Sequence, residues 1–123
     1  MKGISTPPFS LKVKKFTFTR DLTSGTGTQQ ITGIGFKPKA VIILASKNTA
    51  YASVGVDTGG AGGCIYTEGG NFYPDSSESI YHYVNGSDYA YGHIASLDVD
   101  GFTFQWQHVG GSGTLTMQGL ALG

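Results

Sequence analysis

The sequence predicts an all-β protein, a single-domain antiparallel β-sandwich, and three observations support that class. The run from Ala40 to Ala45 is apolar without a break, which is typical of a central strand buried on both faces. The other sizeable segments alternate between apolar and polar residues, and none has the capped i, i+3, i+4 pattern of a helix. Twenty glycines and only 13% charged residues fit many short strands joined by tight turns. Roughly eight to ten such strands favour two packed sheets in a jelly-roll-like arrangement.

The first residues predict an extended N-terminal arm. Residues 1–10 contain Pro7-Pro8 and have no apolar periodicity, so we expect them to form the arm and residues 11–123 to form the domain. The arm also lacks the apolar segment of a signal peptide, and no later segment is long and apolar enough to cross a bilayer. We therefore expect neither a secretory route nor a membrane partner.

The first strand is expected from residue 11. Leu11 and Val13 face one way, and Phe16 and Phe18 continue the apolar face one residue out of phase. A β-bulge near Lys14-Lys15, or a bend that carries the strand from one sheet to the other, would absorb this slip.

The next segments lead into the apolar run. Residues 21–29 are predicted to be a polar loop or hairpin end, and residues 30–36 a short strand. Pro38 fixes its own φ and pushes Lys37 toward an extended conformation, which favours a buried strand over residues 39–46.

The remaining segments predict alternating strands and turns. Strands are expected at residues 50–56, 64–66, 80–84, 89–97, 102–108 and 114–122. A glycine-rich loop is expected at 57–63, and a polar loop at 68–79 is predicted to be an exposed lobe. Asn85-Gly86 predicts a type I′ hairpin turn, and Asp100-Gly101 predicts the next turn. The last four strands are therefore predicted to form a meander.

Residues that often carry chemistry give no positive case here for catalysis, a cofactor or a metal. His82, His93 and His108 lie on predicted strands without a recognised metal-ligand spacing. Cys64 has an apolar strand context, which predicts a buried and unreactive thiol. No serine lies in a nucleophile-elbow motif.

Two loops resemble ligand-binding loops only in part. Asp98-Val99-Asp100-Gly101 begins like a calcium loop but continues without further oxygen ligands, so a hairpin turn explains it. The glycines within residues 59–63 are followed by neither Lys-Ser/Thr nor a helix, as a P-loop would require. We expect a flexible tip there, or a site of close backbone approach.

Few residues are charged, and the basic and acidic residues lie in different parts of the sequence. Residues 1–47 hold all eight Lys and Arg and one acid, whereas residues 48–123 hold the other seven acids. The fold could mix both halves on one surface, or the basic segment from Lys2 to Arg20 could meet an acidic partner or a neighbouring copy. Zero net charge removes the non-specific attraction that nucleic-acid binders use, so we expect no direct nucleic-acid contact. Low charge also favours a subunit whose surface is covered by neighbours.

Aromatic residues gather in the C-terminal two-thirds of the chain, and tyrosine is a favoured interface residue. We expect Phe102, Phe104 and Trp106 to form the core. Contacts with a partner are expected instead from Phe72-Tyr73 and from the neighbourhood of the later tyrosines. An aromatic groove could equally bind sugars.

Three motifs resemble a known family. Gly35-Phe36-Lys37-Pro38-Lys39-Ala40-Val41, Asp98-Val99-Asp100-Gly101-Phe102 and Leu120-Ala121-Leu122-Gly123 are similar to motifs of small β-rich virion structural proteins of tailed bacteriophages. The resemblance covers residues 25–46 and 94–123. It implies a non-enzymatic virion protein, either a capsid decoration (cement) protein or a tail-associated module.

We expect a cement protein, because no coiled coil, collagen-like shaft or β-helix repeat accompanies the domain. Such a protein would be made in the host cytoplasm and would bind the major capsid protein on the capsid surface of the virion, as a homotrimer. The alternative is a tail fibre or baseplate module that binds a receptor or a carbohydrate. No catalytic, cofactor or metal residue is expected. The residues expected to contact the partner are Lys2, Lys12, Lys14, Lys15, Phe72, Tyr73, Tyr83, Tyr89 and Tyr91.

Overall fold

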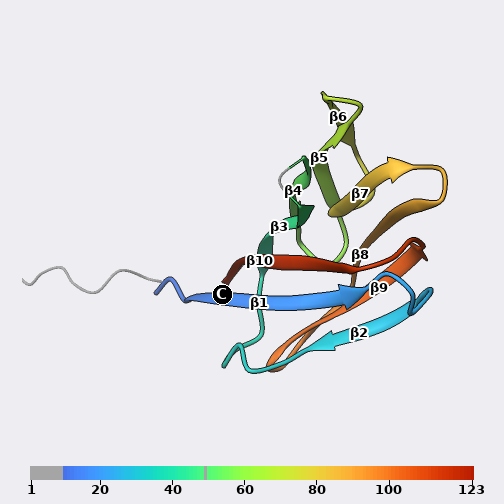
Figure 1. Ribbon diagram of the computed structural model, residues 1–123. Helices are drawn as coiled ribbons and strands as arrows, with labels where there is room; N and C mark the ends of the chain where they lie inside the picture. The colour runs from blue at the N-terminus through green and yellow to red at the C-terminus, as the bar shows by residue number, and fades with distance from the viewer. Residues whose placement is uncertain (1–9, 49) are drawn as a thin grey trace, which may run out of the picture.

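Two antiparallel β-sheets pack face to face in the computed structural model, which describes residues 10–48 and 50–123 (Figure 1). The strands are β1 (Val13–Asp21), β2 (Gly27–Ile31), β3 (Ala40–Asn48), β4 (Tyr51–Asp57), β5 (Gly62–Glu68), β6 (Asn71–Asp75), β7 (Ile80–Asn85), β8 (Asp88–Asp98), β9 (Gly101–Val109) and β10 (Thr114–Leu122). Six of them form the large sheet, in the order β1-β10-β3-β4-β5-β6, and four form the small sheet, in the order β2-β9-β8-β7.

The predicted all-β sandwich is therefore confirmed, and the jelly-roll-like arrangement stays a prediction. The predicted N-terminal arm at residues 1–10 lies outside the described residues except for Ser10.

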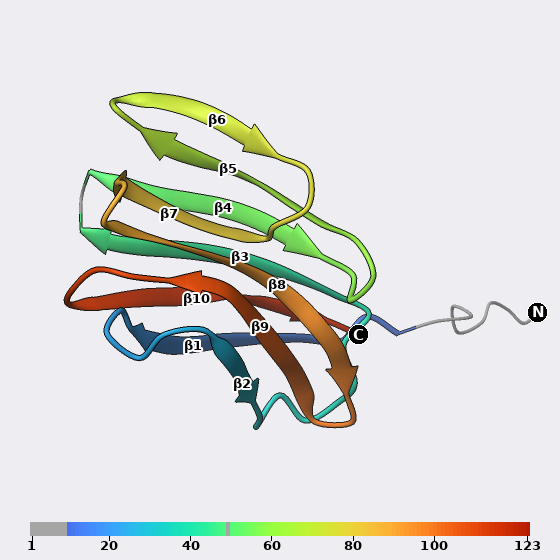
Figure 2. The same cartoon turned by 90° about the vertical axis from the view of Figure 1, so that its right-hand side faces the viewer.

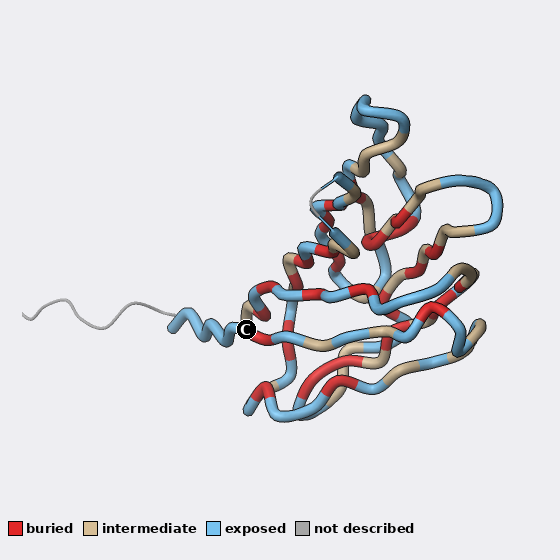
Figure 3. Tube along the Cα trace, viewed as in Figure 1, coloured by how far each residue is buried: buried red, intermediate tan, exposed pale blue. Residues whose placement is uncertain are grey.

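Buried and exposed residues alternate along many of the strands (Figure 3), and the buried apolar side chains form one core between the two sheets. Ile43 of β3 and Met117 of β10 point inward from the large sheet, and Phe104 and Trp106 of β9 do so from the small sheet. All four side chains are fully buried. The indole N–H of Trp106 donates to Oε1 of Gln29 at 2.9 Å, so even this polar group is satisfied inside the core.

The apolar run of β3 is buried on one face only. Val41, Ile43 and Ala45 point into the core, but Leu44 is 41% exposed and Ile42 is half-buried. The prediction that this strand is buried on both faces is therefore wrong for a single chain. The small sheet covers one side of the large sheet, and no described residue forms a layer on the other.

β1 pairs with β10 in one continuous register from Val13 to Asp21, without the predicted bulge or change of sheet. Leu11 and Val13 are exposed, so their apolar side chains face outward and no slip has to be absorbed. Phe16 lies directly opposite Gly119 of β10. A Cβ at Gly119 would come within 2.9 Å of the Phe16 ring, so this glycine leaves the space that the ring fills.

β2 ends at Ile31, so the predicted strand at residues 30–36 is wrong beyond that point. Gly33 and Gly35 have φ values of 83° and 88°, which an extended strand excludes. The Asp100 carboxylate holds this loop by accepting hydrogen bonds from Gly33 N at 3.0 Å and from Gly35 N at 2.7 Å. These two backbone hydrogen bonds lower the pKa of Asp100.

The predicted polar loop at residues 68–79 contains β6. The turn between β5 and β6 is formed by Gly69 and Gly70, with φ values of 58° and 84°, as a type I′ hairpin turn requires. The predicted type I′ turn at Asn85-Gly86 is wrong, although the hairpin is present, because neither Asn85 nor Gly86 has a positive φ.

The predicted meander of four C-terminal strands is wrong in its last member. β7, β8 and β9 are consecutive neighbours in the small sheet, but β10 crosses to the large sheet and lies between β1 and β3 (Figure 2). Gly110 to Gly113 therefore connect the two sheets rather than closing a hairpin within one sheet.

Candidate functional site

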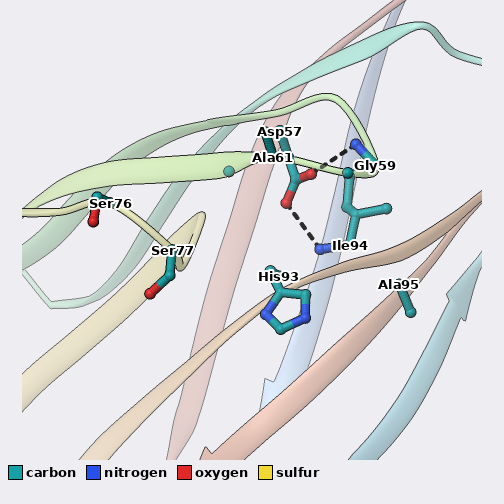
Figure 4. A pocket seen from close by; sticks show the side chains of 10 residues that line it. Asp57, Gly59, Ala61, Ser76, Ser77, His93, Ile94 and Ala95 are labelled. Carbon is teal, nitrogen blue, oxygen red and sulfur yellow. Dashed lines mark hydrogen bonds between the residues drawn. The ribbon is translucent and has the colours of Figure 1, made fainter.

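A cleft of about 450 Å³ opens where the β4–β5 loop approaches β8 (Figure 4). Asp57 is its most buried polar residue, with 1% of its surface exposed. Its Oδ1 accepts a hydrogen bond from Gly59 N at 2.8 Å, and its Oδ2 accepts one from Ile94 N at 2.9 Å. The carboxylate thus ties the glycine-rich loop of the large sheet to the small sheet, which is a structural task.

The same cleft contains His93, whose Nδ1 lies 3.1 Å from Oε2 of the buried Glu78. Ser77 also lines the cleft (Figure 4), but the Ser77 hydroxyl donates to Asp75 Oδ1 at 3.1 Å. A hydrolytic site would need the serine to donate to the histidine. The cleft therefore offers polar contacts to a ligand without a paired nucleophile and base.

A second polar cluster connects β3, β7 and β8. Lys47 Nζ lies 2.6 Å from Asp88 Oδ2, and His82 Nε2 lies 3.0 Å from Asp88 Oδ1. Burial would raise the pKa of Asp88, but the hydrogen bonds from Lys47 and His82 outweigh it and lower that pKa. Burial also lowers the pKa of His82, which favours a neutral imidazole. In this cluster the Asp88 carboxylate is paired with the Lys47 ammonium group and hydrogen-bonded to His82, and all three side chains are largely buried.

Among residues 10–48 and 50–123, no three His, Cys, Asp or Glu side chains are grouped so that they could hold a metal ion. Each histidine has a different neighbour: His82 pairs with Asp88, His93 with Glu78, and His108 stacks on Tyr89. Cys64 is buried, as predicted. Burial first, and then the nearby charges of acidic residues, raise the pKa of its thiol to about 12.

Seven ring side chains form a connected surface that we call the aromatic ladder. Its members are Tyr66, Tyr73, Tyr81, Tyr83, Tyr89, Tyr91 and His108. Tyr66 of the large sheet stacks on Tyr81 of the small sheet, with ring centroids 4.2 Å apart. Tyr81 in turn stacks on Tyr91 at 5.0 Å. Tyr73 and Tyr83 are tilted against their neighbours, whereas the other five rings stack face to face. A ring stacked between two others can present only its edge and its polar group to a partner.

Stacking also affects ionisation within the ladder. Burial first, and then the neighbouring Tyr66 and Tyr91, raise the pKa of Tyr81 to about 12. Its hydroxyl group therefore remains a hydrogen-bond donor at neutral pH.

The structure brings some of the predicted contact residues together and separates others. Tyr73, Tyr83, Tyr89 and Tyr91 all belong to the aromatic ladder. Phe72 is 74% exposed on β6 but points to the opposite face of the large sheet from Tyr73. The predicted basic contacts Lys12, Lys14 and Lys15 are exposed at the β1 edge of the large sheet, whereas Lys2 lies outside the described residues.

The sequence interpretation missed a further surface, the outer face of the large sheet. We use this name for the side chains that point away from the small sheet. Leu44, Val54 and Val56 are 41%, 54% and 56% exposed on this face. The larger apolar side chains on this face are Val13, Ile42, Leu44, Val54, Val56, Ile65, Phe72, Pro74, Leu120 and Leu122. The only charged residues that point outward from the six strands, Lys15 and Asp21, lie on β1 at the edge.

The apolar run of β3 was the sequence signal for this surface, because half of its residues form the centre of the outer face.

No protein family model, no curated protein and no solved structure matches this chain. Within the described residues there is no helix with the length and apolar character needed to span a membrane.

Proposed function

We propose that this protein is a non-enzymatic structural protein of a tailed-phage virion, namely a capsid decoration (cement) protein that binds and stabilises the assembled shell. One observation carries the proposal: five adjacent strands present an outer face without a charged residue. Large apolar patches on soluble proteins mark interaction sites, so this surface favours a subunit that functions within an assembly. The sequence motifs that resemble phage virion proteins supply the setting.

The contacts with the major capsid protein are proposed to lie away from the outer face. Lys12 and Lys14 are exposed at the β1 edge and can meet acidic groups. Tyrosines of the aromatic ladder supply edges and hydroxyl groups, which suit a partly polar interface. Because a cement protein binds the assembled shell better than free subunits, binding itself would stabilise the shell by mass action.

The test adds the purified protein to shells that lack it and to unassembled major capsid protein. We expect saturable co-sedimentation with shells only, and a higher temperature of shell disruption. Absence of binding, or equal binding to unassembled subunits, would refute the cement function.

A charge variant tests the basic contact. The double substitution Lys12→Glu and Lys14→Glu should weaken shell binding more strongly at low salt than at high salt. Lys37→Glu, which changes an exposed lysine outside the strands, is the matched control. An equal effect of both variants would argue against a specific basic contact.

A second candidate function is a tail-associated carbohydrate-binding module, and the aromatic ladder favours it. Tyrosine hydroxyls in a row can bond sugar hydroxyls, and rings at the ends of a stack can pack on sugar C–H groups. Virions without the protein would then lose adsorption to host cells while shell stability is unchanged. Copy number separates the two functions, since hundreds of copies indicate the shell and a few dozen or fewer indicate the tail.

A further inference from the structure

No described residue covers the outer face of the large sheet, although this face carries many apolar side chains. Continuous apolar strands are typical of sheets buried on both sides, and β3 is such a strand with one side uncovered. We propose that this face packs against the same face of a second copy, related by a two-fold axis through the centre of the face. This inference rests on the proposed function only for the setting of the pair in a virion. The pairing itself is argued from the side chains of the outer face.

The apolar residues of the face are arranged in two adjacent rows across the sheet. Antiparallel register places Leu120, Ile42 and Val56 in one row. Leu44, Val54 and Ile65 form the next row. These rows are centred on β3 and β4, the middle strands of the sheet. A two-fold axis through the centre of these rows therefore places aliphatic side chains against aliphatic side chains.

The face is large enough for a stable pair. Strands lie about 4.8 Å apart and rise about 3.4 Å per residue, so six strands with about seven paired residues cover about 700 Å². Standard protein interfaces bury about 800 Å² on each partner. A second copy that covers the whole face would therefore bury an area close to this standard value.

The centre of the outer face carries no charge. The outward-pointing charged residues of the six strands, Lys15 and Asp21, lie on β1 at one edge. Asp75 pairs with the buried Cys64 and therefore points to the opposite face. Interface cores are depleted of charged residues, so the centre of this face fits the core of an interface between two copies.

The test measures the mass of the purified full-length chain by sedimentation, without shells. We expect a species of twice the 12.9 kDa chain mass at micromolar concentration. Val54→Lys places two lysines near the axis and should weaken the pair by more than about 100-fold. The exposed Val54 contributes little to the core, and a thermal unfolding transition will confirm that the variant folds. Val99→Lys, in an exposed turn, is the matched control.

A pair that is unaffected by Val54→Lys would overturn the choice of face. A monomer would overturn the pairing, and a mass of three chains would instead favour the homotrimer expected from the sequence.

Because the assay contains no shell, the pairing and the proposed function can fail separately. A pair that binds no shell refutes the cement function alone, whereas a monomer that binds shells refutes the pairing alone.

Discussion

Gly119 provides a sharp test of how the large sheet is packed. In Gly119→Ala the new methyl group would lie 2.9 Å from Cζ of Phe16, well inside ordinary contact distance. It would also press on the backbone carbonyl of Ile42, the neighbour of its cross-strand partner in β3. A side chain can turn away from such a clash, but a backbone carbonyl in a central strand can move only if the β3–β10 pairing is distorted.

The expected cost follows from these two contacts. Inserting a methyl group into a packed core costs about 1–3 kcal/mol, and the involvement of backbone places this variant near the upper end. For a domain of this size, about 3 kcal/mol lowers the melting temperature by roughly 12 °C. Thermal and urea unfolding at one protein concentration measure the change.

Two further variants isolate the cause. Gly86→Ala adds a methyl group in open space at a position without a positive φ, and it should change the free energy of unfolding by less than about 0.5 kcal/mol. Phe16→Leu shortens the ring that faces Gly119, so the double variant should be less destabilised than the sum of the single changes. The reasoning is refuted if Gly119→Ala has the same melting temperature as the wild-type protein.

The other predictions concern buried polar groups. Asp57→Ala removes both acceptors for Gly59 N and Ile94 N and should lower the free energy of unfolding by about 2–4 kcal/mol, measured by urea denaturation; a wild-type midpoint would contradict the structural task of this carboxylate. Burial lowers the pKa of His82 below its ordinary 6.5, so the unfolded chain binds a proton more readily. The free energy of unfolding should therefore be fully retained above pH 6.5 and should fall as the pH drops from there to the lowered pKa. His82→Gln should flatten that slope in melting curves between pH 7 and 5, and an unchanged slope would assign it to another group. Cys64 should react with iodoacetamide at pH 8 only when the protein is unfolded, because burial raises its pKa to about 12; rapid alkylation of the folded protein would show that the thiol is accessible.

The elements that follow from local pattern were predictable from the sequence. Alternation located β1, β4, β8, β9 and β10, and Asp100-Gly101 located the hairpin between β8 and β9. β6 was missed because Pro74 and the polar residues around it resemble a loop, although the Gly69-Gly70 pair before it is itself a hairpin signal. Local sequence carries this information because turns and alternation depend on neighbouring residues.

Features that depend on distant residues were not predictable. Whether β10 stays in the small sheet or crosses to the large one is decided by pairing with β1 and β3, not by the glycines that precede it. The ladder tyrosines could be singled out, but the stacking of Tyr66 on Tyr81 joins two sheets and has no local signature. The apolar run correctly predicted a central strand, but it could not show which face the chain itself would cover.

The positions of the aromatic residues make the two halves of the molecule optically distinct. Trp106 is the only tryptophan of the chain and is fully buried between the sheets, so its fluorescence reports when water enters the core. The stacked Tyr66 and Tyr81 connect the β5–β6 hairpin to β7, so near-ultraviolet circular dichroism of the tyrosines reports when that hairpin separates. Recording both signals during unfolding would show whether the hairpin detaches before the core opens or whether the sandwich unfolds as one unit.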